Sequence, residues 1–329
     1  MNFKNRNQII KQKLSTSEFA FPIIFKNDCF ISINKENRAI RIKDNEYLKF
    51  NYEVDYNDTW DNLEPFLIDE ENNSIGIFTY NNCNPKFFKI TDIIIDISFQ
   101  FRVVQKTDKC FIFLSYKENL KTNILKKTIL IYDIETERLL DKFFIDYNFI
   151  NASSNGEFGI FSLNNKEAFL YSFKEKKRLI DFNYGQEYLD VAKFSPNGRY
   201  IFFVYGYDLN CKGLGIVYDL EKNAFIYVID YHWYTDDNFK MSFTKDSKYI
   251  ILSCTGLFVS IFETETGNIL SDNENIDTFL YDEKNNKIAY FLKDSDNRRN
   301  YEIYLTDYEI YIEDFDNFLE REIKRFNSL

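Results

Sequence analysis

Two stretches of the chain, FLIDEENNSIGIF at residues 66–78 and FLYDEKNNKIAYF at residues 279–291, agree at most positions. Each is predicted to form a strand, a polar turn and a second strand, because apolar residues flank a run of Asp, Glu and Asn. A second pair has the same form, with FSPNGRYIFF starting at Phe194 and FTKDSKYIIL starting at Phe243. Similar stretches so far apart in the chain indicate an internal repeat.

Weaker copies of this unit begin at Phe25, Val104 and Ala152. The seven starts lie 36 to 49 residues apart, near the ~40–45 residues of a propeller blade. After the turn, each unit continues with alternating segments joined by a short polar hairpin, as at residues 130–143, 259–270 and 303–315. The sequence therefore predicts an all-β fold, a single β-propeller of seven four-stranded blades, with six or eight blades as alternatives.

The repeated phrase is an apolar residue, Ser or Thr, any residue, Asp or Asn, Gly or Ser, Lys or Arg, and Tyr, as at residues 194–200 and 243–249. A Tyr-Asp pair follows at residues 132–133 and 218–219. These motifs resemble, in degenerate form, the WD-repeat superfamily of β-propellers over nearly the whole chain. The resemblance implies a propeller that serves as a protein-interaction platform.

The C-terminal stretch FDNFLEREIKRF has a different periodicity. It places Phe315, Phe318, Leu319, Ile323 and Phe326 on one face of a short helix. Packing of this helix under the propeller is favoured over recruitment of a partner. The expected organisation is a tail or closing strand at residues 1–14, a seven-bladed propeller at 15–313 and an amphipathic helix at 314–329.

The chain is acidic, with 41 Lys and Arg against 52 Asp and Glu and a formal net charge of −11. Such a surface repels phosphate backbones, and the most basic segments, Lys4 to Lys13 and Lys117 to Lys127, lack the interleaved aromatics that stack on bases. Nucleic acid is therefore not an expected partner. The chain shows no signal-peptide pattern and no run near the ~20 apolar residues of a membrane span, so we expect a cytoplasmic protein without membrane contact.

The five cysteines, an odd number, are spread widely and form no Cys-x-x-Cys pair. This pattern favours free thiols over disulfides or a zinc site. The sequence also lacks phosphate-binding, nucleophile-elbow and metalloprotease motifs. We therefore expect no cofactor, no metal and no catalytic residue.

Aromatic and basic residues in the longer connections are the candidate partner-binding residues. The stretch YHWYTDD at 231–237, expected to cross from the fifth blade to the sixth, contains the only histidine. Recurrence of Trp in the crossover at residues 55–66 favours a wedge between blades, and binding is the alternative. His232 alone has no second histidine to help it bind a metal. The candidate binding residues are Trp60, Tyr231, His232, Trp233, Tyr234, Arg298 and Arg299.

Two functions are compatible with this sequence. The first is a non-enzymatic scaffold or adaptor that binds a protein partner through the face formed by the second-to-third-strand loops and the crossovers between blades. The second is a propeller hydrolase or lyase with a carboxylate or metal site in the central channel. The apolar or small residues Val191, Ala192, Met241 and Phe279 of the expected inner strands favour the scaffold.

Overall fold

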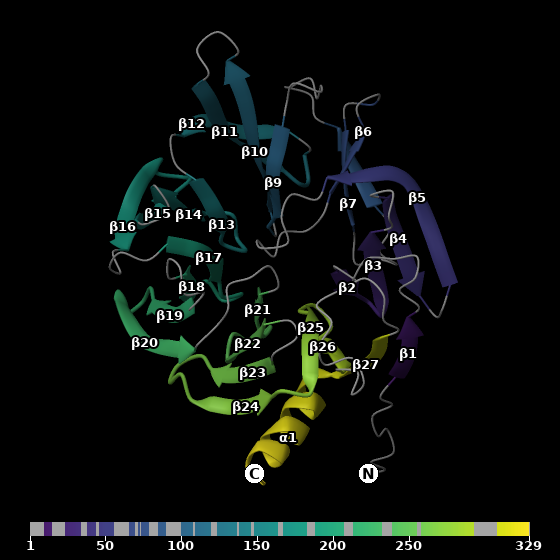
Figure 1. Ribbon diagram of the computed structural model, residues 1–329. Helices are drawn as coiled ribbons and strands as arrows, with labels where there is room; N and C mark the ends of the chain where they lie inside the picture. Colours follow the sequence, from purple (N-terminus) through teal and green to yellow (C-terminus); the bar gives the residue numbers. More distant parts are fainter. Residues whose placement is uncertain are drawn as a thin grey trace, which may run out of the picture. The chain divides into compact units, whose positions relative to one another are not determined.

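The computed structural model describes residues 10–14, 24–33, 38–43, 46–55, 66–69, 72, 74–78, 85–89, 100–107, 109–119, 124–136, 138–145, 148–163, 167–182, 188–206, 213–231, 239–254, 258–292 and 308–328. These residues form antiparallel β-strands and one helix (Figure 1). The chain divides into two compact units. Unit 1 combines Met1–Val54, Phe78–Pro85 and Asn238–Leu329, and unit 2 combines Asp55–Ile77 and Lys86–Asp237.

Unit 1 contains groups of four antiparallel strands and the helix α1 (Phe315–Phe326). The first group is β2 (Ile24–Lys26), β3 (Cys29–Ile33), β4 (Arg38–Lys43) and β5 (Glu46–Asp55). The second is β21 (Phe239–Phe243), β22 (Tyr249–Cys254), β23 (Phe258–Glu263) and β24 (Ile269–Asn273). The third has the order β25 (Ile276–Asp282), β26 (Lys287–Leu292), β27 (Tyr308–Asp314) and β1 (Ile10–Leu14).

Unit 2 repeats the same strand order. It begins with β6 (Phe66–Asp69), β7 (Ser74–Phe78) and β8 (Pro85–Lys89). Next are β9 (Gln100–Lys106), β10 (Cys110–Asn119), β11 (Ile124–Asp133) and β12 (Leu139–Ile145). Two further sheets follow: β13 (Asn148–Ala152), β14 (Phe158–Leu163), β15 (Glu167–Ser172) and β16 (Lys177–Phe182), then β17 (Tyr188–Phe194), β18 (Tyr200–Gly206), β19 (Gly213–Asp219) and β20 (Ala224–Tyr231).

The repeated sequence phrase forms the turn between the first and second strands of a sheet. At residues 195–200, the Ser195 hydroxyl donates to Asn197 Oδ1 at 2.7 Å and accepts from the Tyr200 backbone N–H at 2.8 Å. Gly198 adopts a φ of +73°, which favours a residue without a Cβ. The pattern of Ser or Thr, Asn or Asp, and Gly therefore encodes a turn whose polar groups bond to one another.

The same turn recurs in neighbouring sheets. It is built by Ser153, Asn155 and Phe158 and again by Thr244, Asp246 and Tyr249. A register shift also recurs between the third and fourth strands of four sheets, at Ile131/Tyr132, Leu170/Tyr171, Val217/Tyr218 and Ile261/Phe262. Such bulges bend a strand and increase its twist, so these sheets share one local geometry.

Aromatic and aliphatic side chains fill the space between consecutive sheets within each unit. In unit 2, Phe182 of β16 and Phe203 of β18 are buried, with ring centroids 4.9 Å apart. They belong to a cluster that also contains Ile160, Tyr205 and Ile216. The four apolar or small residues noted in the expected inner strands, Val191, Ala192, Met241 and Phe279, are buried. The high Phe and Tyr content of the chain therefore supplies the packing between sheets.

The last sheet of unit 1 differs from the sequence prediction. Residues 303–315 were expected to form a hairpin, but Tyr308–Asp314 is a single strand, β27, which pairs with β26 on one side. Its other neighbour is β1, with Ile10 opposite Ile312 and Leu14 opposite Tyr308. The hairpin prediction is wrong because the alternation in residues 308–314 is completed by a strand from the other end of the chain.

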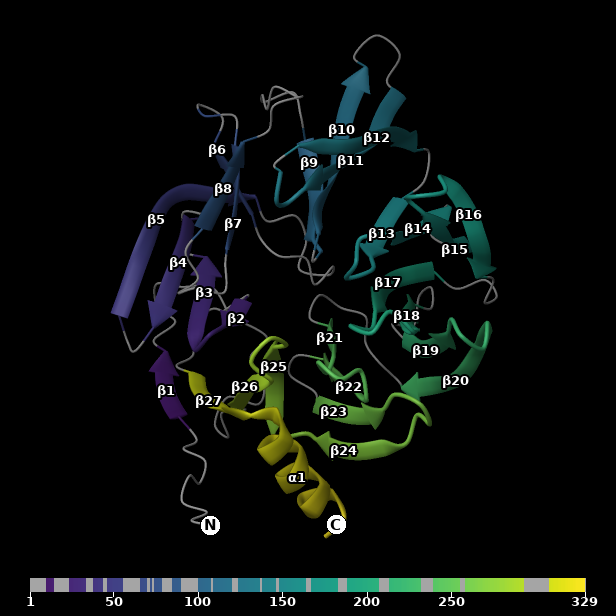
Figure 2. The ribbon, with the colours of Figure 1, turned by 180° about the vertical axis from the view of Figure 1, so that it is seen from behind.

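The predicted C-terminal helix is present as α1, which Figure 2 shows beside β24. Phe315, Phe318 and Leu319 are buried, in one cluster with residues of β22, β23, β25 and β26. Ile323 and Phe326 lie on the same side and are half-buried. The apolar face of α1 therefore packs on unit 1, as the periodicity predicted.

Candidate functional site

The connections between strands fall into two classes. Counted from the bounds of the described strands, the turns that join the first strand to the second, or the third to the fourth, within one sheet contain two to five residues. The intervals after the second and fourth strands contain two to fifteen residues, the longest being 293–307. Because the strands are antiparallel, these classes lie at opposite ends of each sheet. We name them the turn end and the variable end.

Tyr231 is the last residue of β20. The other candidate binding residues fall in sequence intervals between described strands: Trp60 in 56–65, His232, Trp233 and Tyr234 in 232–238, and Arg298 and Arg299 in 293–307. Apart from the backbone of Tyr231, these residues lie outside the described part of the chain, and so do any contacts among them.

A polar cluster occupies the variable end of two neighbouring sheets in unit 1. Lys240 of β21 lies opposite Ser253 of β22 in the register. Ser253 and Thr278 of β25 are fully buried and share a hydrogen bond of 3.2 Å. Asp277, also buried, occupies a register shift at the start of β25, between Ile276 and Thr278. Bulges of this kind redirect a side chain.

Burial lowers the pKa of the Lys240 ammonium to about 8, and the negative charge of Asp277 acts in the opposite direction. A lysine with such a pKa is partly neutral near pH 7, and its neutral amine can accept a proton or act as a nucleophile. Sequence reasoning missed this cluster. The signal was a lysine between the apolar residues Phe239 and Met241 in a short strand.

Charged residues at the turn end serve the fold. The side chain of Asp219, at the end of β19, is fully buried and pairs with Arg199 through Nη2 at 2.8 Å. Its carboxylate also accepts the Glu221 backbone N–H at 2.9 Å. The hydrogen bonds from Arg199 are the largest cause that holds the pKa of Asp219 below its usual value. This ion pair fastens the first turn of the sheet to the third.

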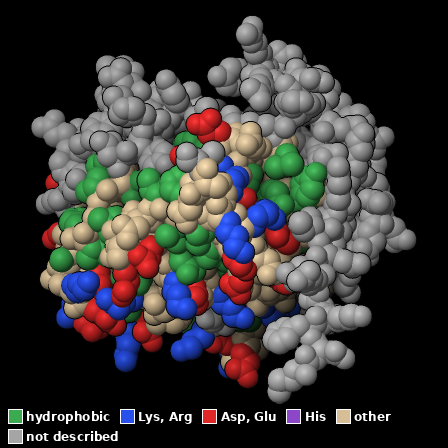
Figure 3. Space-filling view, turned by 90° about the horizontal axis from the view of Figure 1, so that it is seen from below, with side chains coloured by type: hydrophobic (Ala, Val, Ile, Leu, Met, Phe, Trp, Pro, Cys, Tyr) green, Lys and Arg blue, Asp and Glu red, His purple; other side chains and the backbone are tan. Residues whose placement is uncertain are grey.

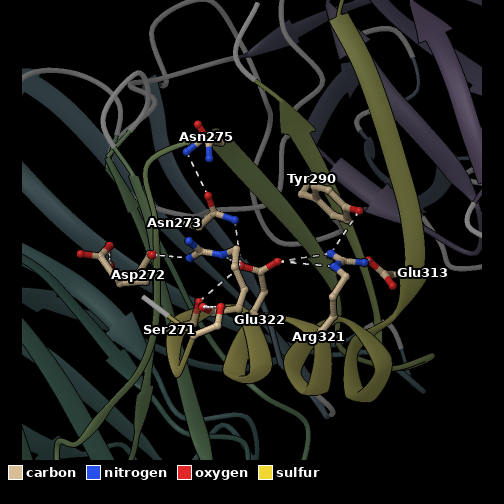
Figure 4. A network of polar contacts seen from close by, with 11 residues as sticks. Ser271, Asp272, Asn273, Asn275, Tyr290, Glu313, Arg321 and Glu322 are labelled. Carbon is tan, nitrogen blue, oxygen red and sulfur yellow. Dashed lines mark hydrogen bonds and ion pairs between the residues drawn. The ribbon is translucent and has the colours of Figure 1, made fainter.

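A second buried carboxylate lies under α1. Figure 4 shows Glu322 pointing from the helix toward β24, where it accepts a hydrogen bond from Asn273 Nδ2 at 2.8 Å and a longer one from Ser271 Oγ at 3.4 Å. Arg325 Nε donates to the same carboxylate at 3.0 Å. Glu322 is only 3% exposed. The hydrogen bonds from these donors offset the free-energy cost of burying its charge.

Arg321, next to Glu322 in the sequence, extends this network to the third sheet of unit 1, which contains β26 and β27. It pairs with Glu313 of β27 and donates to the Tyr290 hydroxyl at 3.2 Å (Figure 4). Burial raises the pKa of Tyr290 well above its usual value. These contacts hold the helix to β24, β26 and β27, so we assign the network a structural role.

In the described residues, no three His, Cys, Asp or Glu side chains are grouped as metal ligands would be. Among the described residues, Cys29 and Cys110 are buried and take part in no disulfide. Figure 3 shows acidic and basic side chains interspersed on one side of the molecule. The helix found in the described part of the chain is too short and too polar to cross a membrane. No protein-family model and no curated protein sequence matches this chain.

Proposed function

We propose that this chain is a seven-bladed, WD-repeat-like β-propeller that acts as a non-enzymatic, cytoplasmic scaffold or adaptor and binds a protein partner at the variable end. The observation that carries this proposal is the unequal length of the connections there, two to fifteen residues, against two to five at the turn end. Repeat proteins place length variation on the face that binds.

The composition of one connection supports the same conclusion. The stretch 231–234, which begins at the last residue of β20, contains two tyrosines, a tryptophan and the histidine. Tyrosine and tryptophan are enriched among the residues that dominate binding energy at protein interfaces. At the turn end, by contrast, Ser195 and Asp219 are occupied by hydrogen bonds within their own sheet.

The test is affinity purification from the source cells with the wild type and with Tyr231→Ala/Trp233→Ala/Tyr234→Ala. A matched control, Lys174→Ala/Glu175→Ala/Lys177→Ala, changes three exposed residues at the turn end. We expect a stoichiometric partner with the wild type and the control, and its loss with the aromatic variant.

Folding of every variant is checked by circular dichroism and thermal melting. If the aromatic variant unfolds while the control melts like the wild type, the aromatic residues form a wedge between sheets and binding must be sought in another connection. If a well-folded aromatic variant keeps the partner at full stoichiometry, the assignment of this connection to binding is refuted.

The cluster of Lys240, Ser253 and Asp277 favours a second candidate, a hydrolase or lyase that uses the lysine as base or nucleophile. In a propeller, first strands line the central channel, where such enzymes hold substrate. Copurification of a small molecule or metal with the wild type, lost in Lys240→Met, would favour this candidate over the scaffold.

A further inference from the structure

Lys240 lies on the face of β21 and β22 that packs against the next sheet of unit 1. Its cross-strand partner is Ser253, and directly paired residues of an antiparallel ladder share one face of the sheet. Ile251, two positions before Ser253, lies on the same face and is buried in one cluster with Ile276 and Phe279 of β25. The side chain of Lys240, which is partly buried, is therefore on the side of β25.

The residues of β25 that face Lys240 are polar. Thr278 is fully buried and shares a hydrogen bond of 3.2 Å with Ser253. Asp277, which is 8% exposed, occupies the register shift beside Thr278, and its charge acts on Lys240. The sequences of β21, β22 and β25 contain one further charged residue, Asp282, which lies at the other end of β25, roughly 17 Å away. One amine and one carboxylate thus meet beside hydroxyl groups and aliphatic side chains.

The equivalent pair in another sheet is apolar. Counted back from the turn, Lys240 and Ser253 form the fourth cross-strand pair of β21 and β22. The fourth pair of β17 and β18 is Val191 and Val204, and both are buried. The repeat therefore accommodates two valines at this place, and the fold does not require an amine and a hydroxyl. Polar groups that are costly to bury and that folding does not need indicate a functional site.

An amine in this position can react as a nucleophile. Burial brings the pKa of Lys240 to about 8, so roughly a tenth of the amine is neutral at pH 7, against about 0.04% for a lysine with the usual pKa of about 10.4. A neutral lysine amine adds to the carbon of a carbonyl group. The Asp277 carboxylate can accept the proton that the nitrogen loses and return it to the hydroxyl group that leaves.

We propose that Lys240 is a covalent binding site for a small, uncharged aldehyde, which it holds as an imine beside β25. The Nζ lone pair adds to the carbonyl carbon, and the oxygen takes up a proton. It then leaves as water while the C=N bond forms, so nothing is oxidised or reduced. The aliphatic side chains of Ile251 and Ile276 and the negative charge of Asp277 favour an uncharged aldehyde over an anionic one.

This inference rests on the second candidate function, because it makes Lys240 the nucleophile and names the class of substrate. It does not depend on the scaffold role. A protein partner that binds through residues 231–234 would leave the chemistry of Lys240 unchanged.

The test treats the full wild-type chain with propanal at pH 7 and reduces the imine with sodium cyanoborohydride, which leaves a propyl group on the amine. Peptide mapping by mass spectrometry then measures the rate of labelling at each lysine. Lys245 and Lys248, in the turn that follows β21, are exposed and serve as internal controls. We expect Lys240 to be labelled at least about tenfold faster than either control.

The dependence of labelling on pH separates a built site from a reactive side chain. Labelling of Lys240 should rise with a midpoint near pH 8, whereas labelling of Lys245 and Lys248 should keep rising toward about pH 10. Asp277→Asn removes a charge that favours the ammonium form, so the midpoint for Lys240 should move to lower pH in a variant that still melts cooperatively.

Three results would overturn the inference. The first is labelling of Lys240 no faster than that of Lys245 and Lys248. The second is equally selective labelling of the chain in concentrated urea, since the fold would then contribute nothing. The third is labelling by glyoxylate, an anionic aldehyde, as fast as labelling by propanal.

The inference and the second candidate function can fail separately. Selective labelling by propanal while no small molecule copurifies with the wild type would leave the aldehyde site standing and remove the support for the enzyme. A copurified molecule that is lost in Lys240→Met, with no selective labelling by propanal, would make Lys240 a base and overturn the covalent site.

Discussion

Removal of the Glu322 carboxylate tests the assignment of the α1 network to the fold. The carboxylate accepts hydrogen bonds from Asn273, Ser271 and Arg325 and is 3% exposed. In Glu322→Ala these donors lose a common acceptor. Asn273 and Ser271 are buried and cannot turn to water, whereas the guanidinium of Arg325 lies partly in solvent.

The expected cost follows from these environments. Leaving a buried donor without an acceptor costs about 1–3 kcal/mol, and breaking a fully buried ion pair costs about 3–5 kcal/mol. Because Arg325 can be rehydrated, we expect about 3 kcal/mol for Glu322→Ala. Glu322→Gln keeps an acceptor for Asn273 but removes the charge that faces Arg325, so its cost should be about half as large.

The assay is urea and thermal unfolding followed by circular dichroism, with Glu320→Ala as the control. Glu320 is on the same helix and is exposed, with its carboxylate paired only to Lys324 among the described contacts. We expect Glu322→Ala to lower Tm by about 4 °C and Glu320→Ala to leave it unchanged. Equal effects of the two changes would refute the view that this buried network holds α1 to the sheets.

Two further predictions concern charge. Asp219 has a pKa below its unfolded value because of Arg199, so its contribution to stability is complete above about pH 4 and is lost as pH falls through the folded pKa. Arg199→Met should lower stability at pH 7 and shrink the acid-induced loss, measured by urea unfolding between pH 2 and pH 7; an unchanged profile would contradict the pairing. Lys240 has a folded pKa of about 8 against about 10.4 unfolded, so wild-type stability should rise between these pH values, by up to about 3 kcal/mol. Lys240→Met should lack this rise, and a rise that persists would identify a different titrating group.

Several structural features could be predicted from the sequence because they depend on neighbouring residues. The turn at residues 195–200 uses one hydroxyl, one amide and one glycine within six positions, so the phrase itself specifies it. The hairpins at 130–143 and 259–270 follow from alternation around a polar turn. The face of α1 that is buried follows from the 3.6-residue spacing of its apolar residues.

For the candidate site, the binding residues named from the sequence stay a prediction, because all of them except the backbone of Tyr231 lie outside the described residues. The cluster of Lys240 and Asp277 was not found, because these residues are 37 positions apart in the sequence and meet only through the packing of two neighbouring sheets.

The sequence by itself determined the repeat, the strands, the turn chemistry and the terminal helix, since each is encoded within a short window by spacing and residue type. Only the tertiary structure decided that the strand at residues 10–14 completes the last sheet beside β27. It also decided that Glu322 is buried against Asn273. The physical reason is that strand registers and buried charge networks depend on which distant segments pack together. The local periodicity of the sequence does not specify these contacts.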